Sequence, residues 1–117
     1  MIIDLPTIRD RFSALSSDYE NAKPFPHVAL DGLFDQDTLR TIESEFPAAR
    51  DMGGSFSGEI EGGKFTESDW EKFGSVTQEF ISACNSAPFL HALSALTGID
   101  GLLPDPYLAG GGQHQTG

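Results

Sequence analysis

Four segments of this chain carry apolar residues at helical spacing, and the sequence contains very little strand to cover them. The first stripe is Leu5, Ile8, Phe12, Leu15 and Tyr19, at intervals of three or four residues. Three more stripes follow within residues 35–46, 68–84 and 86–98. Each stripe makes one helix face apolar, so each helix must bury that face against another element. The pattern predicts an α+β fold whose helices pack on one face of a sheet, most of which lies outside the chain.

The first two helices have recognisable ends. Asp4 is expected as the N-cap of the first helix, with Pro6 in its first turn. Asn21 to Pro26 ends that helix, because two prolines force extended backbone. The second helix is expected to begin near Asp35 and to close at Pro47. Its inward-facing residues are predicted to be Leu39, Ile42 and Phe46.

The third and fourth helices are also marked by caps. Ser68 and Glu71 form a capping-box pattern, which predicts that the third helix starts there. The predicted inner face of this helix is Trp70, Phe73, Thr77, Phe80, Ile81 and Cys84. Ser86 is expected to cap the fourth helix, and Gly98 to end it. The predicted inner face of the fourth helix is Phe89, Leu90, Leu93 and Leu96.

Only three short stretches favour strands. His27 to Leu30 is predicted to be a short strand that Asp31-Gly32 ends. Residues 50–64 hold five glycines and little periodicity, which indicates a long loop with a possible strand near Phe56 to Ile60. The last residues, which follow Gly110–Gly112, are expected to form a third strand.

Composition bounds the function class. The chain has 117 residues, which suits a single domain over 1–117, and a formal net charge of −11. Nucleic acids and anionic membranes would be repelled, so neither is an expected partner. The single cysteine, Cys84, excludes an intrachain disulfide, and we interpret it as a core thiol in preference to a nucleophile. No apolar run is long enough to span a membrane and no signal pattern opens the chain, so we expect a cytoplasmic location.

The polar residues do not assemble a recognisable catalytic or metal motif. An iron site of the two-His-one-carboxylate kind usually shows His-x-Asp, and none of His27, His91 and His114 has a carboxylate two residues on. The triple glycine at 110–112 lacks the lysine and hydroxyl of a phosphate-binding loop. Paired acids such as Asp35/Asp37 and Glu43/Glu45 are interpreted as caps and solvated charge. We therefore assign no catalytic residue and no metal ligand within this chain.

Several short segments nevertheless occur in a recognisable order. They are PFPHVALDGLF (24–34), EFP (45–47), GKF (63–65), NSAPFL (85–90), LTGI (96–99), LLPDP (102–106) and GGGQHQ (110–115). Their order resembles the N-terminal part of the iron(II)- and 2-oxoglutarate-dependent oxygenases, in the prolyl 4-hydroxylase-like branch. The resemblance covers nearly the whole chain and is clearest from residue 24 onward.

The resemblance implies a helical support layer and the first strand or strands of a double-stranded β-helix (jelly roll), with the remainder absent from this chain. In that family the glycine-led strand precedes His-x-Asp, a third ligand, and an Arg or Lys for the 2-oxoglutarate carboxylate. The chain ends before these motifs. Gln113, His114 and Gln115 match the strand that enters the β-helix, where side chains approach cosubstrate or substrate. Strand alternation places Gln113 and Gln115 on one face and His114 on the other.

The function implied by the resemblance is hydroxylation of a substrate C–H bond, in a prolyl peptide or a small molecule. The full-length family uses Fe(II), 2-oxoglutarate and, as reductant, ascorbate, and none of these is expected to bind this chain alone. The expected partner is the C-terminal barrel portion of the same protein, and the chain by itself is expected to be inactive. The alternatives are a small acidic helical interaction module without catalysis, and an enzyme of unrelated type.

Overall fold

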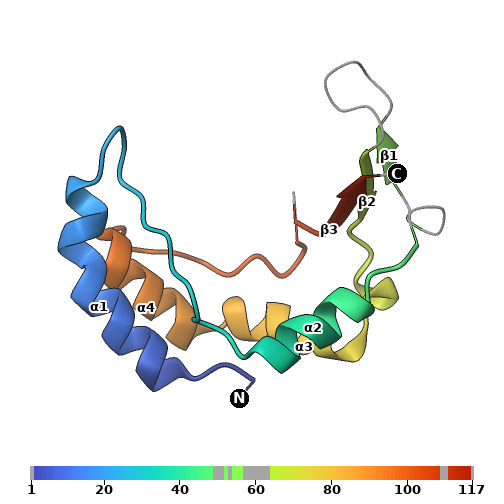
Figure 1. The fold of residues 1–117 in the computed structure, drawn as a ribbon, viewed down its shortest axis with the longest axis horizontal. Coiled ribbons are helices and arrows are strands. Elements are labelled where there is room, and N and C mark those ends of the chain that lie inside the picture. The colour runs from blue at the N-terminus through green and yellow to red at the C-terminus, as the bar shows by residue number, and fades with distance from the viewer. Residues whose placement is uncertain (1, 49–51, 53, 57–63, 109–110, 117) are drawn as a thin grey trace.

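The structure is a computed structural model that describes residues 2–48, 52, 54–56, 64–108 and 111–116. It is mostly helical, with a small antiparallel sheet (Figure 1). The helices are α1 (Leu5–Asn21), α2 (Gln36–Ser44), the 3-10 turn η2 (Trp70–Lys72), α3 (Ser75–Cys84) and α4 (Ala87–Thr97). The strands are β1 (Gly54–Phe56), β2 (Lys64–Glu67) and β3 (Gln113–Thr116).

The main hydrophobic core lies where α1 packs along α4. Its buried members are Ile3, Ile8, Phe12, Ala83, Ala92 and Leu96. The Phe12 and Phe89 rings meet edge to face with centroids 6.0 Å apart, a favourable arrangement for two aromatic quadrupoles. The stripe predicted for the first helix is confirmed, because Leu5, Leu15 and Tyr19 also pack against this core.

The predicted ends of α1 and α4 are confirmed. The Asp4 carboxylate accepts a hydrogen bond of 3.2 Å from the Thr7 amide, so it satisfies one of the free N–H groups of the first turn. The Ser86 hydroxyl likewise accepts from the Phe89 amide at the start of α4. Gly98 ends α4 with a φ of 73°, the left-handed conformation that glycine adopts without a Cβ penalty.

The α2 helix forms where the sequence predicts it, but its apolar face is poorly covered. Asp35 caps it by accepting from the Thr38 amide at 2.9 Å. None of its residues is buried. Leu39 and Phe46, predicted to face inward, are 40% and 37% exposed. The prediction was wrong for these two side chains because α2 contacts mainly α3 and leaves part of its stripe without a covering layer.

The third helix starts later than the capping-box pattern predicts. Asp69, not Ser68, acts as the cap, by accepting from the Glu71 amide at 3.1 Å, and this supports only the short η2 turn. The backbone is then extended through Phe73 and Gly74. Trp70 is consequently outside α3 and 37% exposed, which corrects its predicted inward position, whereas Phe73 is buried in the connection.

A side chain from another helix caps α3. The Glu45 carboxylate accepts hydrogen bonds from the amides of Val76, at 3.0 Å, and Thr77, at 3.4 Å. A Cβ at Gly74 would collide with this carboxylate, so a larger residue there would have to displace the Glu45 side chain from its capping position. Because Glu45 follows directly after α2, this cap joins α2 to α3.

We predict that Glu45→Ala will lower the free energy of unfolding by about 1–2 kcal/mol, since a helix cap and two amide partners are lost. Urea denaturation followed by far-UV circular dichroism measures the change. Glu43→Ala is the matched control, because Glu43 is exposed on the same helix. Equal effects of the two substitutions would contradict the capping role of Glu45.

The predicted strand at His27–Leu30 was wrong. The segment is irregular and pairs with no strand among the described residues. Val28 and Leu30 are half-buried and pack their side chains against the α1–α4 core instead. The alternation of apolar residues therefore reflects packing of an irregular segment on helices, which produces the same pattern as a half-buried strand.

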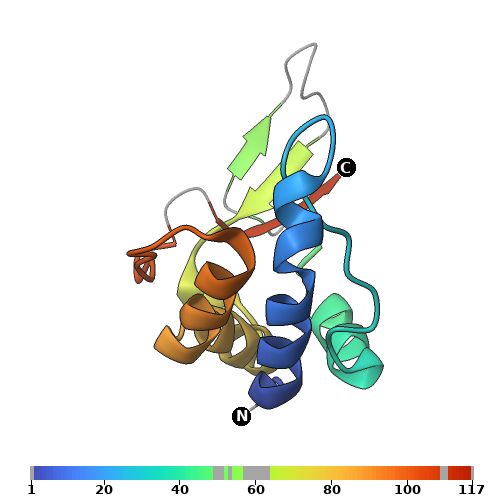
Figure 2. The same cartoon turned by 90° about the vertical axis from the view of Figure 1, so that its left-hand side faces the viewer.

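The three strands form an antiparallel sheet in the order β1-β2-β3. The register pairs Phe56 with Lys64, Thr66 with His114, and Glu67 with Gln113. The predicted C-terminal strand is confirmed as β3. The strand predicted near Phe56 to Ile60 is found as β1, at Gly54–Phe56, and residues 57–60 lie outside the described residues. In the view of Figure 2 the sheet stands above α3 and α4, and the upper turns of α1 overlap its lower part.

The chain is more open than a compact domain of its size. Its radius of gyration is 16.1 Å, whereas about 13.4 Å is expected for a compact domain of this length. The accessible surface of 7811 Å² likewise exceeds the roughly 6,200 Å² expected for this mass. Figure 1 shows the cause, since the α1–α4 pair and the sheet stand at opposite ends of a curved arrangement. The mixed helix and sheet content matches the predicted α+β class in this coarse form, and the described residues show no jelly roll.

Candidate functional site

The β3 strand carries the three predicted site residues, and it turns Gln113 and His114 to opposite faces. Gln113 is only 4% exposed, whereas His114 is exposed. The alternation predicted for these two residues is therefore confirmed. Gln115 pairs with Phe65 along the strand. We call the face that carries Gln113 the covered face and the face that carries His114 the open face.

Glu67 of β2 lies beside Gln113 on the covered face, and sequence analysis missed it. Its carboxylate is 3% exposed, accepts from the Asp69 amide at 3.1 Å and lies 3.5 Å from the Lys72 ammonium. These contacts show that the chain following β2 folds over the covered face. A buried carboxylate needs such partners, because its desolvation is otherwise expensive. Glu67 is the register partner of Gln113 in the pairing of β2 with β3, and the sequence alone does not show this pairing.

The buried amide of Gln113 is unusual. Neither its Oε1 nor its Nε2 has a hydrogen-bond partner within the described part of the chain. A buried amide without partners destabilises a fold by roughly 1–3 kcal/mol, so proteins retain few of them. Gln113 is therefore a buried amide without hydrogen-bond partners in the described part of the chain, on the strand that the sequence predicted.

The three histidines lie on three separate elements. His27 is exposed and its Nδ1 lies 2.7 Å from the Phe25 carbonyl oxygen. His91 is exposed on α4 and His114 is exposed on β3. Among residues 2–48, 52, 54–56, 64–108 and 111–116, no three metal-binding side chains come together. The residues described here therefore do not fit an iron centre.

The glycines before β3 serve a close backbone approach. Gly112 has a φ of 150°, and a Cβ there would collide with the Glu67 carbonyl oxygen. The neighbouring Gly111 would meet the Leu108 side chain, which can move. Gly110 lies outside the described residues. At Gly112, where β3 begins against β2, the absence of a side chain allows this backbone conformation and close approach.

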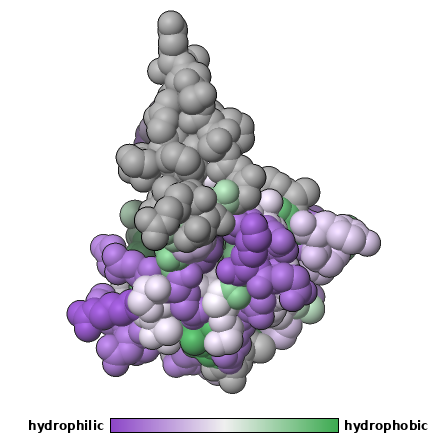
Figure 3. All heavy atoms as spheres, turned by 90° about the vertical axis from the view of Figure 1, so that its right-hand side faces the viewer, coloured by the Kyte–Doolittle hydropathy of each residue, from purple (hydrophilic) through white to green (hydrophobic). Residues whose placement is uncertain are grey.

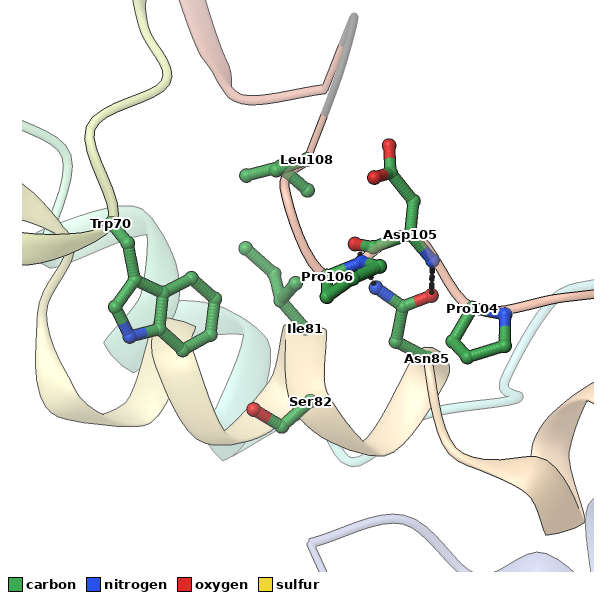
Figure 4. A pocket seen from close by; sticks show the side chains of 8 residues that line it. All are labelled: Trp70, Ile81, Ser82, Asn85, Pro104, Asp105, Pro106 and Leu108. Atoms are coloured by element: carbon green, nitrogen blue, oxygen red, sulfur yellow. Dashed lines mark hydrogen bonds between the residues drawn. The ribbon is translucent and has the colours of Figure 1, made fainter.

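A pocket of about 370 Å³ lies between α3 and the segment that leads to β3. It is lined by Trp70, Ile81, Ser82, Asn85, Pro104, Asp105, Pro106 and Leu108 (Figure 4). The apolar pattern predicts Trp70 and Ile81 on the inner face of a helix and does not indicate a pocket there. The signal available in the sequence was the pair of prolines around Asp105, which favour an extended segment able to form a wall.

Asn85 holds that wall in place. Its Nδ2 donates to the Asp105 carbonyl oxygen at 2.9 Å, and its Oδ1 accepts from the Asp105 amide at 3.1 Å. The Asn85 side chain therefore pairs with a backbone unit twenty positions away, as a neighbouring strand would. Both dashed bonds are visible in Figure 4. This contact positions the approach to β3 against the end of α3.

Cys84 is half-buried near the end of α3, and burial raises the pKa of its thiol to about 11. Desolvation disfavours the charged thiolate, which is the nucleophilic form. The interpretation of Cys84 as an unreactive structural thiol is therefore supported.

We predict that folded protein will react with iodoacetamide roughly 100-fold more slowly than urea-unfolded protein at about pH 8, because a pKa near 11 leaves that much less thiolate than the ordinary value of 9.0. Mass spectrometry of the alkylated fraction over time measures both rates. Similar rates in the two states would contradict the shifted pKa.

Among the coloured residues of the face shown in Figure 3, most are hydrophilic, with small hydrophobic patches between them. Within the described residues, no helix has the length and apolar character needed to cross a membrane. Comparison with protein-family models, curated proteins and solved structures found no match for this chain.

Proposed function

We propose that this chain is the N-terminal part of an Fe(II)- and 2-oxoglutarate-dependent dioxygenase that hydroxylates a C–H bond of a prolyl peptide or a small molecule. The observation that carries the proposal is β3, because the segment resembling the strand that enters the β-helix is a strand at the edge of an antiparallel sheet. One face of that strand is covered by the chain that follows β2, and the other is open.

The open face is the side on which we place the reaction site. Thr66 and His114 are register partners and share this face. In a double-stranded β-helix, one face of each sheet lines the interior and the other is covered from outside. Because Glu67 and Gln113 occupy the covered face, His114 is the predicted site residue best placed to reach a substrate or cosubstrate. Gln113, on the covered face, would help to position the strand.

The iron chemistry is assigned to residues outside this chain, since the described residues do not fit the metal. When bound, Fe(II) with 2-oxoglutarate supplies the oxidising power for C–H hydroxylation, with ascorbate as reductant. The role we propose for the present residues is structural. The helices support the sheet, Asn85 and Gly112 place β3, and β3 offers its free edge to the rest of the barrel.

The open shape of the chain is consistent with this proposal. An incompletely covered α2 and a radius of gyration of 16.1 Å are expected of helices that support a larger sheet. Exposed apolar side chains favour a second candidate function, a small acidic interaction module. In that case Leu103 and Tyr107, which are 84% and 90% exposed, would contact a partner protein.

The coding sequence beyond Gly117 tests the proposal most directly. A His-x-Asp motif shortly after Gly117, in frame, is expected for the oxygenase. A stop codon at that point, in a verified sequence, would refute it and favour the interaction module.

We predict that the 117-residue chain, supplied with Fe(II), 2-oxoglutarate and ascorbate, will form no succinate above background. The protein extended by the downstream reading frame is expected to convert 2-oxoglutarate to succinate. His114→Ala in the extended protein should lower turnover with substrate, and His91→Ala, on the exposed side of α4, is the matched control. Succinate formation by the 117-residue chain itself, lost on His114→Ala, would contradict the assignment of the metal ligands to residues outside the chain.

A further inference from the structure

The pocket between α3 and residues 104–108 has the composition of a binding site for a side chain. Its volume of about 370 Å³ lies in the lower part of the range of roughly 300–1,000 Å³ typical of small-ligand sites. In Figure 4 the indole of Trp70 stands at one end, Pro104, Asp105 and Pro106 stand at the other, and Ile81 and Ser82 lie between them. The pocket therefore offers a flat aromatic surface, apolar walls and one carboxylate.

Both ends of this pocket are fixed by hydrogen bonds. At one end the Trp70 carbonyl oxygen accepts from the Gln78 side chain of α3 at 2.8 Å. At the other end Asn85 holds the backbone of Asp105 on both sides. The Asp105 Oδ1 also accepts from the Tyr107 amide at 3.1 Å, which orients the carboxylate. A site fixed in this way loses little conformational entropy when a ligand binds.

The stretch of sequence that supplies the pocket residues is strongly acidic. Residues 65–108 contain one basic side chain, Lys72, which pairs with Glu67. The acidic side chains of the same stretch are Glu67, Asp69, Glu71, Glu79, Asp100 and Asp105. An acidic segment of this kind attracts cations and repels phosphates and carboxylates.

We propose that this pocket binds an arginine side chain of a partner protein. The guanidinium would stack on the Trp70 indole, its aliphatic stem would contact Ile81 and Leu108, and the Asp105 carboxylate at the other end of the pocket would attract it electrostatically. Arginine suits the site better than lysine because its planar, weakly hydrated cation stacks on aromatic faces. The inference stands apart from the proposed oxygenase function, because it uses none of the predicted site residues.

Two exposed side chains beside the pocket favour a protein as the source of this arginine. Leu103 and Tyr107 flank the wall residues and are 84% and 90% exposed. Exposed leucine and tyrosine next to a pocket supply the apolar contact area that a free amino acid could not use. The partner is therefore expected to present arginine between apolar residues.

Trp70 is the only tryptophan of the chain, so its fluorescence reports the pocket directly. The probe is the peptide acetyl-Gly-Leu-Arg-Leu-Gly-amide, and the matched control replaces arginine with citrulline, which has nearly the same shape and no charge. The arginine peptide is expected to change Trp70 emission in a saturable way, and the citrulline peptide to bind roughly 10-fold more weakly. Equal affinities, or no saturable change up to about 10 mM of the arginine peptide, would overturn the proposal.

Asp105→Asn tests the carboxylate without disturbing the wall, because Asn85 contacts only the backbone of this residue. We expect the arginine peptide to bind about 3- to 10-fold more weakly to this variant, and the citrulline peptide to bind unchanged. Asp18→Asn, an exposed acid on α1, is the control for net charge. If both variants weakened binding equally, the effect would be general charge attraction and the assignment to Asp105 would be wrong.

Discussion

Replacing Phe12 with alanine should remove most of the stability of the α1–α4 core. Phe12 is 3% exposed and meets the Phe89 ring at 6.0 Å. Truncating a buried phenylalanine costs about 3–5 kcal/mol, from lost burial and from the cavity left behind. Small domains have only about 5–15 kcal/mol in total, and this chain, with its open shape, is expected at the lower end. We therefore expect the variant to be largely unfolded or to melt far below the parent.

Urea denaturation followed by far-UV circular dichroism measures this effect. Ser13→Ala is the matched control, because Ser13 is the exposed neighbour of Phe12 on α1. The control should change stability by less than about 0.5 kcal/mol. A Phe12→Ala variant as stable as the control would show that α1 and α4 do not form the central core.

Replacing Gly112 with alanine should detach β3 from β2. A Cβ at this position would collide with the Glu67 backbone carbonyl, and the φ of 150° is one that other residues rarely adopt. The backbone strain alone is worth about 1–3 kcal/mol, and the collision involves main-chain atoms that a side-chain rotation cannot relieve. Because β3 pairs only with β2 in the described sheet, we expect loss of this pairing without loss of the helices.

Hydrogen exchange distinguishes this local effect from global unfolding. The amides of β2 and β3 should lose their protection in Gly112→Ala, while those of α1 and α4 keep theirs. Gly111→Ala is a demanding control, because it changes the adjacent glycine but meets only the flexible Leu108 side chain. Retained protection of β3 in Gly112→Ala would show that the strand does not depend on this close approach.

These two variants separate the parts of the proposed enzyme. Phe12 belongs to the helical layer, and Gly112 belongs to the strand that presents His114. In a protein extended past Gly117, Gly112→Ala should abolish activity while the helical core stays folded. Asn85 connects the two parts, because it holds the Asp105 backbone from the end of α3.

Local signals predicted α1 and α4 well. Asp4 and Ser86 act as caps within their own turns, Gly98 adopts the left-handed conformation, and the apolar stripes face each other. Such features depend on residues three or four positions apart, which a sequence shows directly. The existence of β3 and the opposed faces of Gln113 and His114 were predictable for the same reason, since strand alternation is local.

Several failures involve contacts between residues distant in sequence. Val28 and Leu30 alternate like a strand but pack on helices. Ser68 begins a capping-box pattern, yet the carboxylate that caps α3 comes from Glu45. The burial of Glu67 beside Gln113 and the hydrogen bonds between Asn85 and the Asp105 backbone had no local signature.

The sequence by itself determined the helical stripes, their nearest caps, the acidic charge and the position of the glycines before the last strand. These properties follow from backbone sterics and from neighbours within one or two turns of the chain. Only the tertiary structure decided which face of β3 is covered, which carboxylate caps α3, and where Trp70 and Asp105 form a pocket. Each of these depends on bringing distant segments together. Local preferences leave several arrangements nearly equal in free energy, and the hydrogen bonds and burial formed between distant segments select one of them.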